Sequence, residues 1–233
     1  MSIGIILTPD NRSKAYIQKI LENNLKLDHI IFMNDNKIEK KYSDDIVNTS
    51  KKFGFDISKS VINTLSENKI DFKEFPFVDI NNHELKKYID SISIDNLIFS
   101  GGGILKDEIL SSNVNFIHFH PGITPEYRGS TCFYYSILNQ NHAGVTAFFM
   151  DKTLDTGDII FQKKFEKPSH PYLDEIFDPY IRSETLIEVI KTNRLSSSNF
   201  IKQDVTSGET YYIIHPVLKH ISILNCLSND SSI

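Results

Sequence analysis

Residues 97–119 read LIFSGGGILKDEILSSNVNFIHF, and this stretch decides the fold. It holds two short apolar runs, Leu97–Ser100 and Asn115–Phe119, separated by glycines and polar residues. Short runs rich in Ile and Phe are typical of strands that a parallel sheet buries on both faces. The same kind of run occurs three times earlier, at Ile3–Leu7, His29–Met33 and Phe72–Phe75.

Amphipathic stretches lie between these runs. Ser13–Leu25 places Ile17 and Ile20 at helical spacing, and Asp44–Ser66 and His83–Ser91 show the same pattern. We expect a break in the second stretch near Gly54. Strands that alternate with helices predict an α/β fold, a mostly parallel sheet covered by helices.

The pattern changes after residue 140 to a pair of strands joined by a turn-rich segment. We predict a main domain over residues 1–195 and a short C-terminal extension over residues 196–233. The predicted later elements are strands at Val145–Met150 and Ile159–Phe165, a helix at Ser183–Asn193, a connector at Leu195–Asn199 and a strand at Glu209–His215.

The amino-acid composition and the net charge of the chain exclude or disfavour several classes of function. Among 233 residues, 40% are hydrophobic and 24% charged, as in ordinary globular domains. The net charge of -5 disfavours nucleic acid as a substrate. No apolar run approaches the roughly 20 residues of a membrane span, and the N-terminus lacks a basic start, so we expect a cytoplasmic protein without a membrane partner. Cys132 and Cys226 have no metal-ligand spacing, and we expect reduced thiols and no metal.

Polar residues with catalytic potential follow the run Asn115–Phe119. His118 and His120 are two residues apart on a predicted strand and so share one face. Loops at the carboxyl ends of parallel strands are where such sheets bind ligands. A second polar loop, Leu154–Asp158, contains two aspartates, of which one can point toward the histidines while the other caps the turn.

Three blocks of the chain resemble the folate-dependent formyltransferases. They are Ser100–Leu105, the segment Ile117–Gly129 with its His-Pro-Gly and Pro-Glu-Tyr-Arg-Gly, and Gly144–Thr146 leading to Leu154–Ile160. The resemblance is strong over residues 95–165 and weak before them. It implies a twisted, mostly parallel, Rossmann-like sheet with helices on both faces.

The resemblance also implies catalytic residues. His120 matches the family's catalytic histidine and Asp155 its catalytic aspartate, which would raise the basicity of the imidazole and help order a water. The family carries an asparagine that steadies the oxyanion where this chain has His118. An imidazole can still donate one hydrogen bond there, so His118 is the third candidate catalytic residue.

The family's co-substrate is N10-formyltetrahydrofolate, and no metal is implied. Gly101–Leu105 falls where the family's backbone grips the pterin ring, and Phe149–Asp155 is the companion wall. The candidate cofactor-binding residues are Gly102, Gly103, Ile104, Leu105, Met150 and Asp155.

The amine acceptor follows by elimination. The first loop, Thr8–Ser13, has no glycine and contains Asp10, which would repel the phosphate of a ribonucleotide. The tRNA enzymes carry a further C-terminal domain. A nucleotide-linked amino sugar remains, and a second copy of the chain is a candidate partner. The alternatives are a formyltetrahydrofolate hydrolase, or a non-catalytic protein that binds folate or a sugar nucleotide because His118 replaces the asparagine.

Overall fold

The computed structural model describes residues 1–35, 39–197 and 199–228. The chain forms two compact units. The first comprises Met1–His118 and Phe149–Lys152, and the second comprises Phe119–Phe148 and Thr153–Ile233. The boundary at residues 195 and 196 that the sequence suggested stays a prediction.

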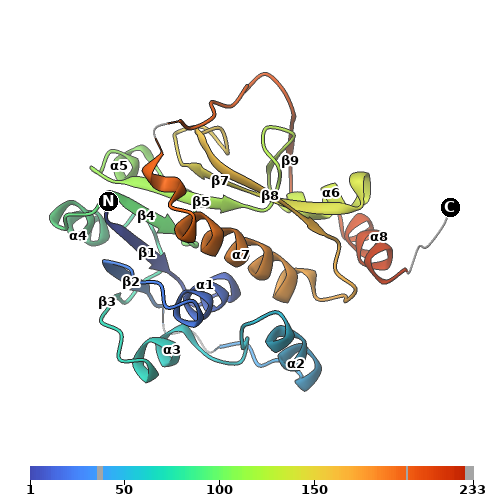
Figure 1. Ribbon diagram of the computed structural model, residues 1–233, viewed down its shortest axis with the longest axis horizontal. Helices are drawn as coiled ribbons and strands as arrows, with labels where there is room; N and C mark the ends of the chain where they lie inside the picture. Colours follow the sequence, from blue (N-terminus) through green and yellow to red (C-terminus); the bar gives the residue numbers. More distant parts are fainter. Residues whose placement is uncertain (36–38, 198, 229–233) are drawn as a thin grey trace. The chain divides into compact units, whose positions relative to one another are not determined.

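The first unit is built on parallel strands, drawn in blue to green in Figure 1. β1 lies between β2 and β4, β3 flanks β2, and β5 flanks β4. The register places Ile5 opposite both Ile30 and Ile98, so apolar side chains align across the sheet. The strands are β1 (Ile3–Leu7), β2 (His29–Met33), β3 (Lys73–Phe75), β4 (Asn96–Phe99) and β5 (Asn115–His120).

Helices cover both faces of this sheet. The chain passes from β1 to β2 and β3 on one side of β1 and then to β4 and β5 on the other side. Because such crossovers are right-handed, the helices that precede β3 and those that follow it lie on opposite faces of the sheet. Figure 1 shows α1 and α3 on one side of the strands and α4 and α5 on the other. The helices are α1 (Asn11–Glu22), α2 (Asp44–Lys52), α3 (Val61–Glu67), α4 (His83–Ser91) and α5 (Asp107–Leu110).

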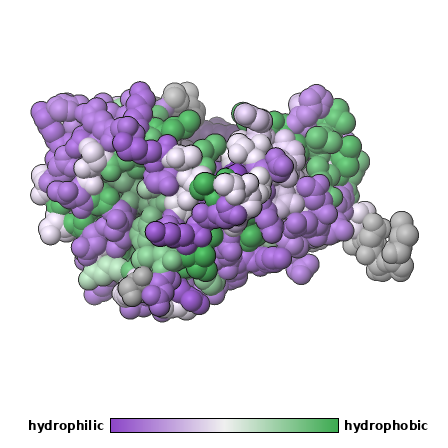
Figure 2. Space-filling model, turned by 90° about the horizontal axis from the view of Figure 1, so that it is seen from above, coloured by the Kyte–Doolittle hydropathy of each residue, from purple (hydrophilic) through white to green (hydrophobic). Residues whose placement is uncertain are grey.

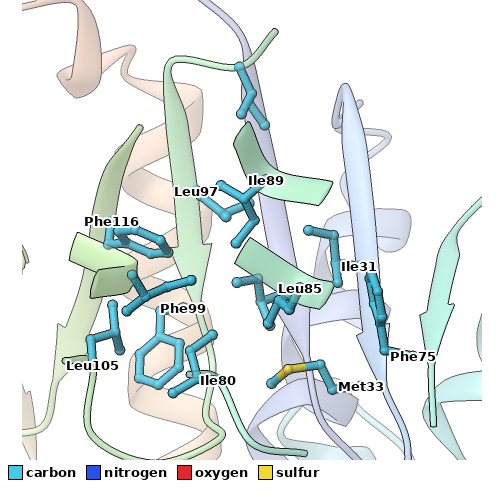
Figure 3. Packing of buried hydrophobic residues seen from close by; sticks show 13 residues of the cluster. Ile31, Met33, Phe75, Ile80, Leu85, Ile89, Leu97, Phe99, Leu105 and Phe116 are labelled. Carbon is cyan, nitrogen blue, oxygen red and sulfur yellow. The ribbon is translucent and has the colours of Figure 1, made fainter. Parts of the chain in front are cut away.

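The core on the α4 side consists of alternate strand residues packed against the helices (Figure 3). Leu85 and Ile89 of α4 lie over Leu97 and Ile31, and all four side chains are inaccessible to solvent. Burying side chains of this size stabilises the fold by about 1.5–3 kcal/mol each, which holds the strand ends in place.

The second unit contains an antiparallel pair, β7 and β8, and a small parallel pair, β6 and β9. The complete strand order is β3-β2-β1-β4-β5-β7-β8, so the predicted mostly parallel α/β sheet is confirmed. The elements are β6 (Tyr127–Gly129), α6 (Cys132–Gln140), β7 (His142–Phe149), β8 (Ile159–Glu166), a π-helix (Leu173–Phe177), α7 (Asp178–Lys191), a 3-10 helix (Arg194–Ser196), β9 (Glu209–Tyr211) and α8 (Pro216–Leu227).

Some predicted elements differ from the structure. The break expected near Gly54 is confirmed, because Asp44–Ser66 holds two helices and the chain leaves the first of them at Gly54, whose φ of +79° suits glycine. The strand expected over Glu209–His215 ends at Tyr211, because Pro216 starts α8 and His215 caps it. Ser198, in the predicted connector, lies outside the described residues.

Two further observations concern the described part of the chain. It contains no helix that combines the length and the apolar character needed to cross a bilayer. Cys132 and Cys226 are buried free thiols, and burial raises the pKa of Cys132 to about 12. A thiol with such a pKa is a poor nucleophile at neutral pH.

Candidate functional site

His120 is anchored inside the second unit by its own loop. Its Nε2 lies 2.8 Å from the carbonyl oxygen of Tyr127. A carbonyl only accepts hydrogen bonds, so Nε2 carries the proton and donates. In the neutral imidazole the lone pair is then on Nδ1, which lies 3.4 Å from Oδ2 of Asp155. Nδ1 is therefore the atom that can take up a proton, with a carboxylate beside it.

Gly122 of the His-Pro-Gly motif makes room for this anchor. A Cβ at this position would lie 2.6 Å from the Tyr127 oxygen and 2.8 Å from Nε2 of His120. Any side chain would thus collide with both partners of the hydrogen bond. The loop is held from β7, because the Thr146 hydroxyl donates to the Gly122 oxygen at 2.7 Å and accepts from the Thr124 N–H at 3.0 Å.

Asp155 is positioned by its backbone and by β6. Its φ of +54° is in the left-handed region, which aspartate tolerates better than most residues. The N–H of Gly129 donates to Oδ2 at 2.7 Å. Gly129 itself must lack a side chain, because a Cβ there would overlap the backbone oxygen of Tyr211 in β9. The C-terminal segment thus packs directly behind the loop that holds the carboxylate.

The electrostatics keep His120 neutral at rest. Its side chain is almost fully buried, and this desolvation lowers the pKa of the imidazole below its usual value of 6.5. Asp155 acts in the opposite direction and raises the pKa, whereas Arg182 lowers it. Arg182 is held by Asp178 and by the Phe119 carbonyl, both at 2.7 Å. A proton that reaches Nδ1 forms an ion pair with Asp155, which suits a general base or a proton relay.

His118 ends the first of the two segments that make up the first unit. It is half-buried on β5, and its ring lies 6.0 Å from that of Phe99 in β4. Its role as an oxyanion donor stays a prediction.

The first unit also contains a pocket of about 710 Å³ where β1 to β4 end. The sheet order reverses between β1 and β4, and ligands of α/β proteins bind at such reversals. Asp10, Asp35, Glu39 and Asp79 line the pocket together with Lys40, so carboxylates outnumber cations among the lining residues that the structure describes. This lining favours a ligand with N–H donors over a phosphate.

The predicted cofactor residues occupy different surroundings. Gly102 and Gly103 line the pocket with φ values of +121° and +108°. Among the described residues, only a methyl carbon of Ile80, at 4.0 Å, approaches a Cβ built on Gly103, so a flat ring has room at this backbone. Ile104 is 80% exposed, whereas Leu105 is buried in the core. Met150 packs, partly buried, against that core, and Asp155 belongs to the second unit.

The start of α1 does not offer a phosphate site. Asp10 caps the helix, accepting from the Ser13 N–H at 2.8 Å and from the Thr8 hydroxyl at 3.1 Å. The capping carboxylate places its negative charge where a phosphate would otherwise bind.

Comparison with known proteins agrees with this geometry. Residues 26–171 match the family model described as formyl transferase. The chain belongs to the formyl transferase family. It is 29% identical over 167 residues to the methionyl-tRNA formyltransferase of Thermotoga maritima and 34% identical over 119 residues to that of Borrelia garinii subsp. bavariensis. These matches cover 68% and 50% of this chain and 52% and 38% of the relatives, so the chain spans about half of their length or less.

Solved formyltransferases share the fold. WlaRD, a sugar 3N-formyl transferase solved in the presence of dTDP and 5-N-formyl-THF, superposes over 97% of this chain and 79% of its own with a TM-score of 0.64 at 19% identity. The N-formyltransferase of Helicobacter canadensis, in complex with folinic acid and dTDP-3-aminofucose, superposes over 97% and 81% with a TM-score of 0.64 at 18% identity. At these identities the likeness concerns the fold.

Sequence reasoning missed the backbone partners of His120 and Asp155 in the candidate site. The Tyr127 carbonyl carries no signal in the residue type, since every residue has one. Gly122 and Gly129 did carry a signal, because glycines that flank a candidate histidine and a carboxylate-binding loop mark close approaches of the backbone.

Proposed function

We propose that this protein transfers the formyl group of N10-formyltetrahydrofolate to the amino group of a nucleotide-linked amino sugar. The observation that carries the proposal is the His120–Asp155 pair, in which a neutral, anchored imidazole presents its basic nitrogen to a carboxylate. Membership of the formyl transferase family supports the reaction type. A cytoplasmic location stays part of the proposal.

The transfer of a formyl group to an amine has three steps in which a bond, a charge or a proton changes place. The amine attacks the formyl carbon, the carbonyl oxygen becomes negative, and the C–N bond to folate breaks as the folate nitrogen gains a proton. Asp155 is the more exposed member of the pair, with 10% of its side chain accessible against 2% for His120. We assign the proton from the amine to the pair, relayed through Asp155 or a water to Nδ1 of His120.

The resulting imidazolium is stabilised by the carboxylate at 3.4 Å, while the Tyr127 carbonyl keeps the ring from turning. The same proton is then available for the departing folate nitrogen. We assign the oxyanion to His118, whose imidazole can donate one hydrogen bond.

We assign the folate to the pocket of the first unit. Open space in front of Gly103 admits a flat ring, and the carboxylates of the lining suit the N–H donors of a pterin. These residues therefore fit the co-substrate.

The amino sugar is favoured as acceptor because sugar enzymes superpose on this chain with a higher TM-score than a tRNA enzyme does, 0.64 for WlaRD against 0.52 for the methionyl-tRNA formyltransferase from Clostridium thermocellum. WlaRD and the Helicobacter canadensis enzyme superpose on 97% of this chain and are sugar formyltransferases or bind an amino-sugar nucleotide. The sequence relatives are methionyl-tRNA formyltransferases but match over about half of their length or less. The net charge of -5 also disfavours an RNA acceptor.

The test is an acceptor panel. The protein is incubated with N10-formyltetrahydrofolate and dTDP-3-aminofucose, other nucleotide-linked amino sugars, or methionyl-tRNA, and formylated product is measured by mass spectrometry. We expect formylation of an amino sugar and a loss of at least about a hundredfold in the His120→Ala variant. Formylation of methionyl-tRNA alone would overturn the acceptor. Formate release without an amine would identify a hydrolase, and folate binding without turnover a binding protein.

A further inference from the structure

One edge of β6 holds both members of the His120–Asp155 pair. The Tyr127 carbonyl oxygen lies 2.8 Å from Nε2 of His120. Two residues further on, the Gly129 N–H donates to Oδ2 of Asp155 at 2.7 Å. The backbone N–H and C=O groups of alternate residues in a strand point to the same edge. The two hydrogen bonds that hold the pair therefore come from one edge of a strand of three residues.

The opposite edge of β6 is held by the C-terminal segment. β6 and β9 form a two-stranded parallel sheet. The Glu209 N–H donates to the Glu126 carbonyl at 3.2 Å. At the other end, the Ser130 N–H donates to the Tyr211 carbonyl at 2.8 Å. Even-numbered residues of this stretch thus bind β9, whereas the odd-numbered residues 127 and 129 bind the pair. A displacement of β9 would therefore move both supports of the pair.

The side chain of Tyr211 fastens β9 to β6. Its ring stacks on that of Tyr127, with the ring centroids 5.2 Å apart and 18° between the ring planes. Tyr135 of α6 is a second ring neighbour, with its centroid 4.5 Å from that of Tyr211. Aromatic pairs at such distances stabilise a contact beyond the area that they bury. Tyr127 is only 4% exposed, so the stack covers the residue whose carbonyl anchors His120.

The residues that follow Tyr211 are exposed instead. Tyr212 and Ile213 have exposed fractions of 80% and 79%. Figure 2 shows hydrophobic residues, in green, gathered at the end of the molecule that carries α8 in Figure 1. Tyr211 and Tyr212 are thus adjacent residues of the same type that differ in packing, and Tyr212 is the matched control for Tyr211.

Two contacts fix the chain just before β9. The Arg128 guanidinium, which is buried, donates to the Val205 carbonyl at 3.2 Å. A Cβ on Gly208 would overlap the Pro125 carbonyl, so the two backbones are in direct contact there. The C-terminal segment is therefore bound along residues 125–130, from Val205 to Tyr211.

We propose that Tyr211 is a positioning residue, which holds His120 and Asp155 in place through β9 and β6. On this basis the C-terminal extension over residues 196–233 supports the site from behind. Loss of the ring frees β9 and β6 to move, so that both hydrogen bonds of the pair lengthen together. A displacement of reacting groups by about 1 Å can lower a rate by about a hundredfold. The inference rests on the proposed function, in which the pair moves the proton of the amine.

The first test compares the kinetics of Tyr211→Ala, Tyr211→Phe and Tyr212→Ala with those of the wild type. Formyl transfer is measured with varied N10-formyltetrahydrofolate and the acceptor identified by the panel. We expect Tyr211→Ala to lower kcat at least about tenfold and to change the KM for the folate by less than about twofold, because the pair moves and the folate pocket does not. Tyr211→Phe keeps the stacked ring, and the Tyr212 side chain is exposed, so both should keep the wild-type kcat.

The second test does not require turnover. The nitrogen chemical shifts of the His120 imidazole, assigned by NMR with a His120→Gln variant, report which ring nitrogen carries the proton. We expect the Nε2–H tautomer in the wild type and in both controls, and a mixture of tautomers in Tyr211→Ala. Tyr211→Leu keeps an apolar side chain beside Tyr127 but lacks the ring, so it replaces the alanine variant if that variant does not fold, and its tautomers should change in the same direction.

The two tests together decide the proposal. Wild-type kcat in a folded Tyr211→Ala or Tyr211→Leu variant would overturn it. A reduced kcat with only the Nε2–H tautomer would also overturn it, because the loss would not arise from a displaced His120. If the wild type transfers no formyl group to any acceptor, the proposed function fails, while the tautomer still decides whether Tyr211 positions the imidazole.

Discussion

Replacing Asp155 by Asn removes one charge from the His120–Asp155 pair with little change of shape. The amide oxygen can still accept from the Gly129 N–H, which lies 2.7 Å from Oδ2 in the wild type. The left-handed backbone at this position is one that asparagine also tolerates. We therefore expect the variant to fold, so that the change in activity reports on the lost carboxylate.

The expected magnitude follows from the distance between Nδ1 of His120 and Oδ2, 3.4 Å. Two unit charges at that distance attract by about 5 kcal/mol at an effective dielectric constant of about 20. The amide dipole retains part of this attraction. We expect turnover to fall by at least about a hundredfold, which corresponds to about 2.7 kcal/mol of transition-state stabilisation.

Two measurements check this expectation. Formyl transfer measures the loss of turnover. NMR titration of His120, assigned with a His120→Gln variant, should show that its pKa falls further below 6.5, because the carboxylate that raises it is gone. Asp158→Asn, in the same turn, is the matched control and should change neither quantity. An unchanged pKa of His120 in Asp155→Asn would refute the electrostatic coupling, whatever happens to turnover.

Four further results are expected. Gly122→Ala should lower both stability, by about 1–3 kcal/mol, and turnover, because its Cβ displaces the His120–Tyr127 hydrogen bond; thermal unfolding and kinetics measure this, and wild-type values for both would contradict it. Gly103→Val should weaken binding of a formyltetrahydrofolate analogue in calorimetry, and unchanged affinity would move the pterin site elsewhere. His118→Asn should keep measurable transfer, whereas His118→Ala should lose about 2–4 kcal/mol of transition-state stabilisation, and equal rates would leave His118 a structural residue. Since the folded pKa of His120 is below 6.5, the unfolded chain binds more protons below that pH; the free energy of unfolding should fall as pH drops from about 6.5, and by less in His120→Gln.

Local sequence patterns predicted the limits of a helix or strand correctly where residues at its own ends mark those limits. β1, β2 and α4 have the predicted limits, because buried runs end at polar or turn residues and α4 begins after its cap, Asn82. The three motif blocks likewise identified the family from residue types and spacing alone. Periodicity failed for α8, which is apolar on two faces and shows no polar side to mark it as a helix.

Two adjacent residues show that the burial of a side chain cannot always be predicted from the sequence. Ile104 and Leu105 are both apolar and adjacent, yet Ile104 is 80% exposed and Leu105 only 7%. Residue type does not distinguish them, because burial depends on which side of the loop faces the core.

The sequence by itself determined the mostly parallel α/β sheet, the family and the candidate pair His120 and Asp155. Only the tertiary structure decided which nitrogen of His120 is basic, because the Tyr127 carbonyl that binds Nε2 is a backbone group without a sequence signature. It also decided that His120 is buried and that its pKa is lowered. Burial and backbone hydrogen bonds depend on segments far apart in the chain, and local sequence patterns carry no information about them.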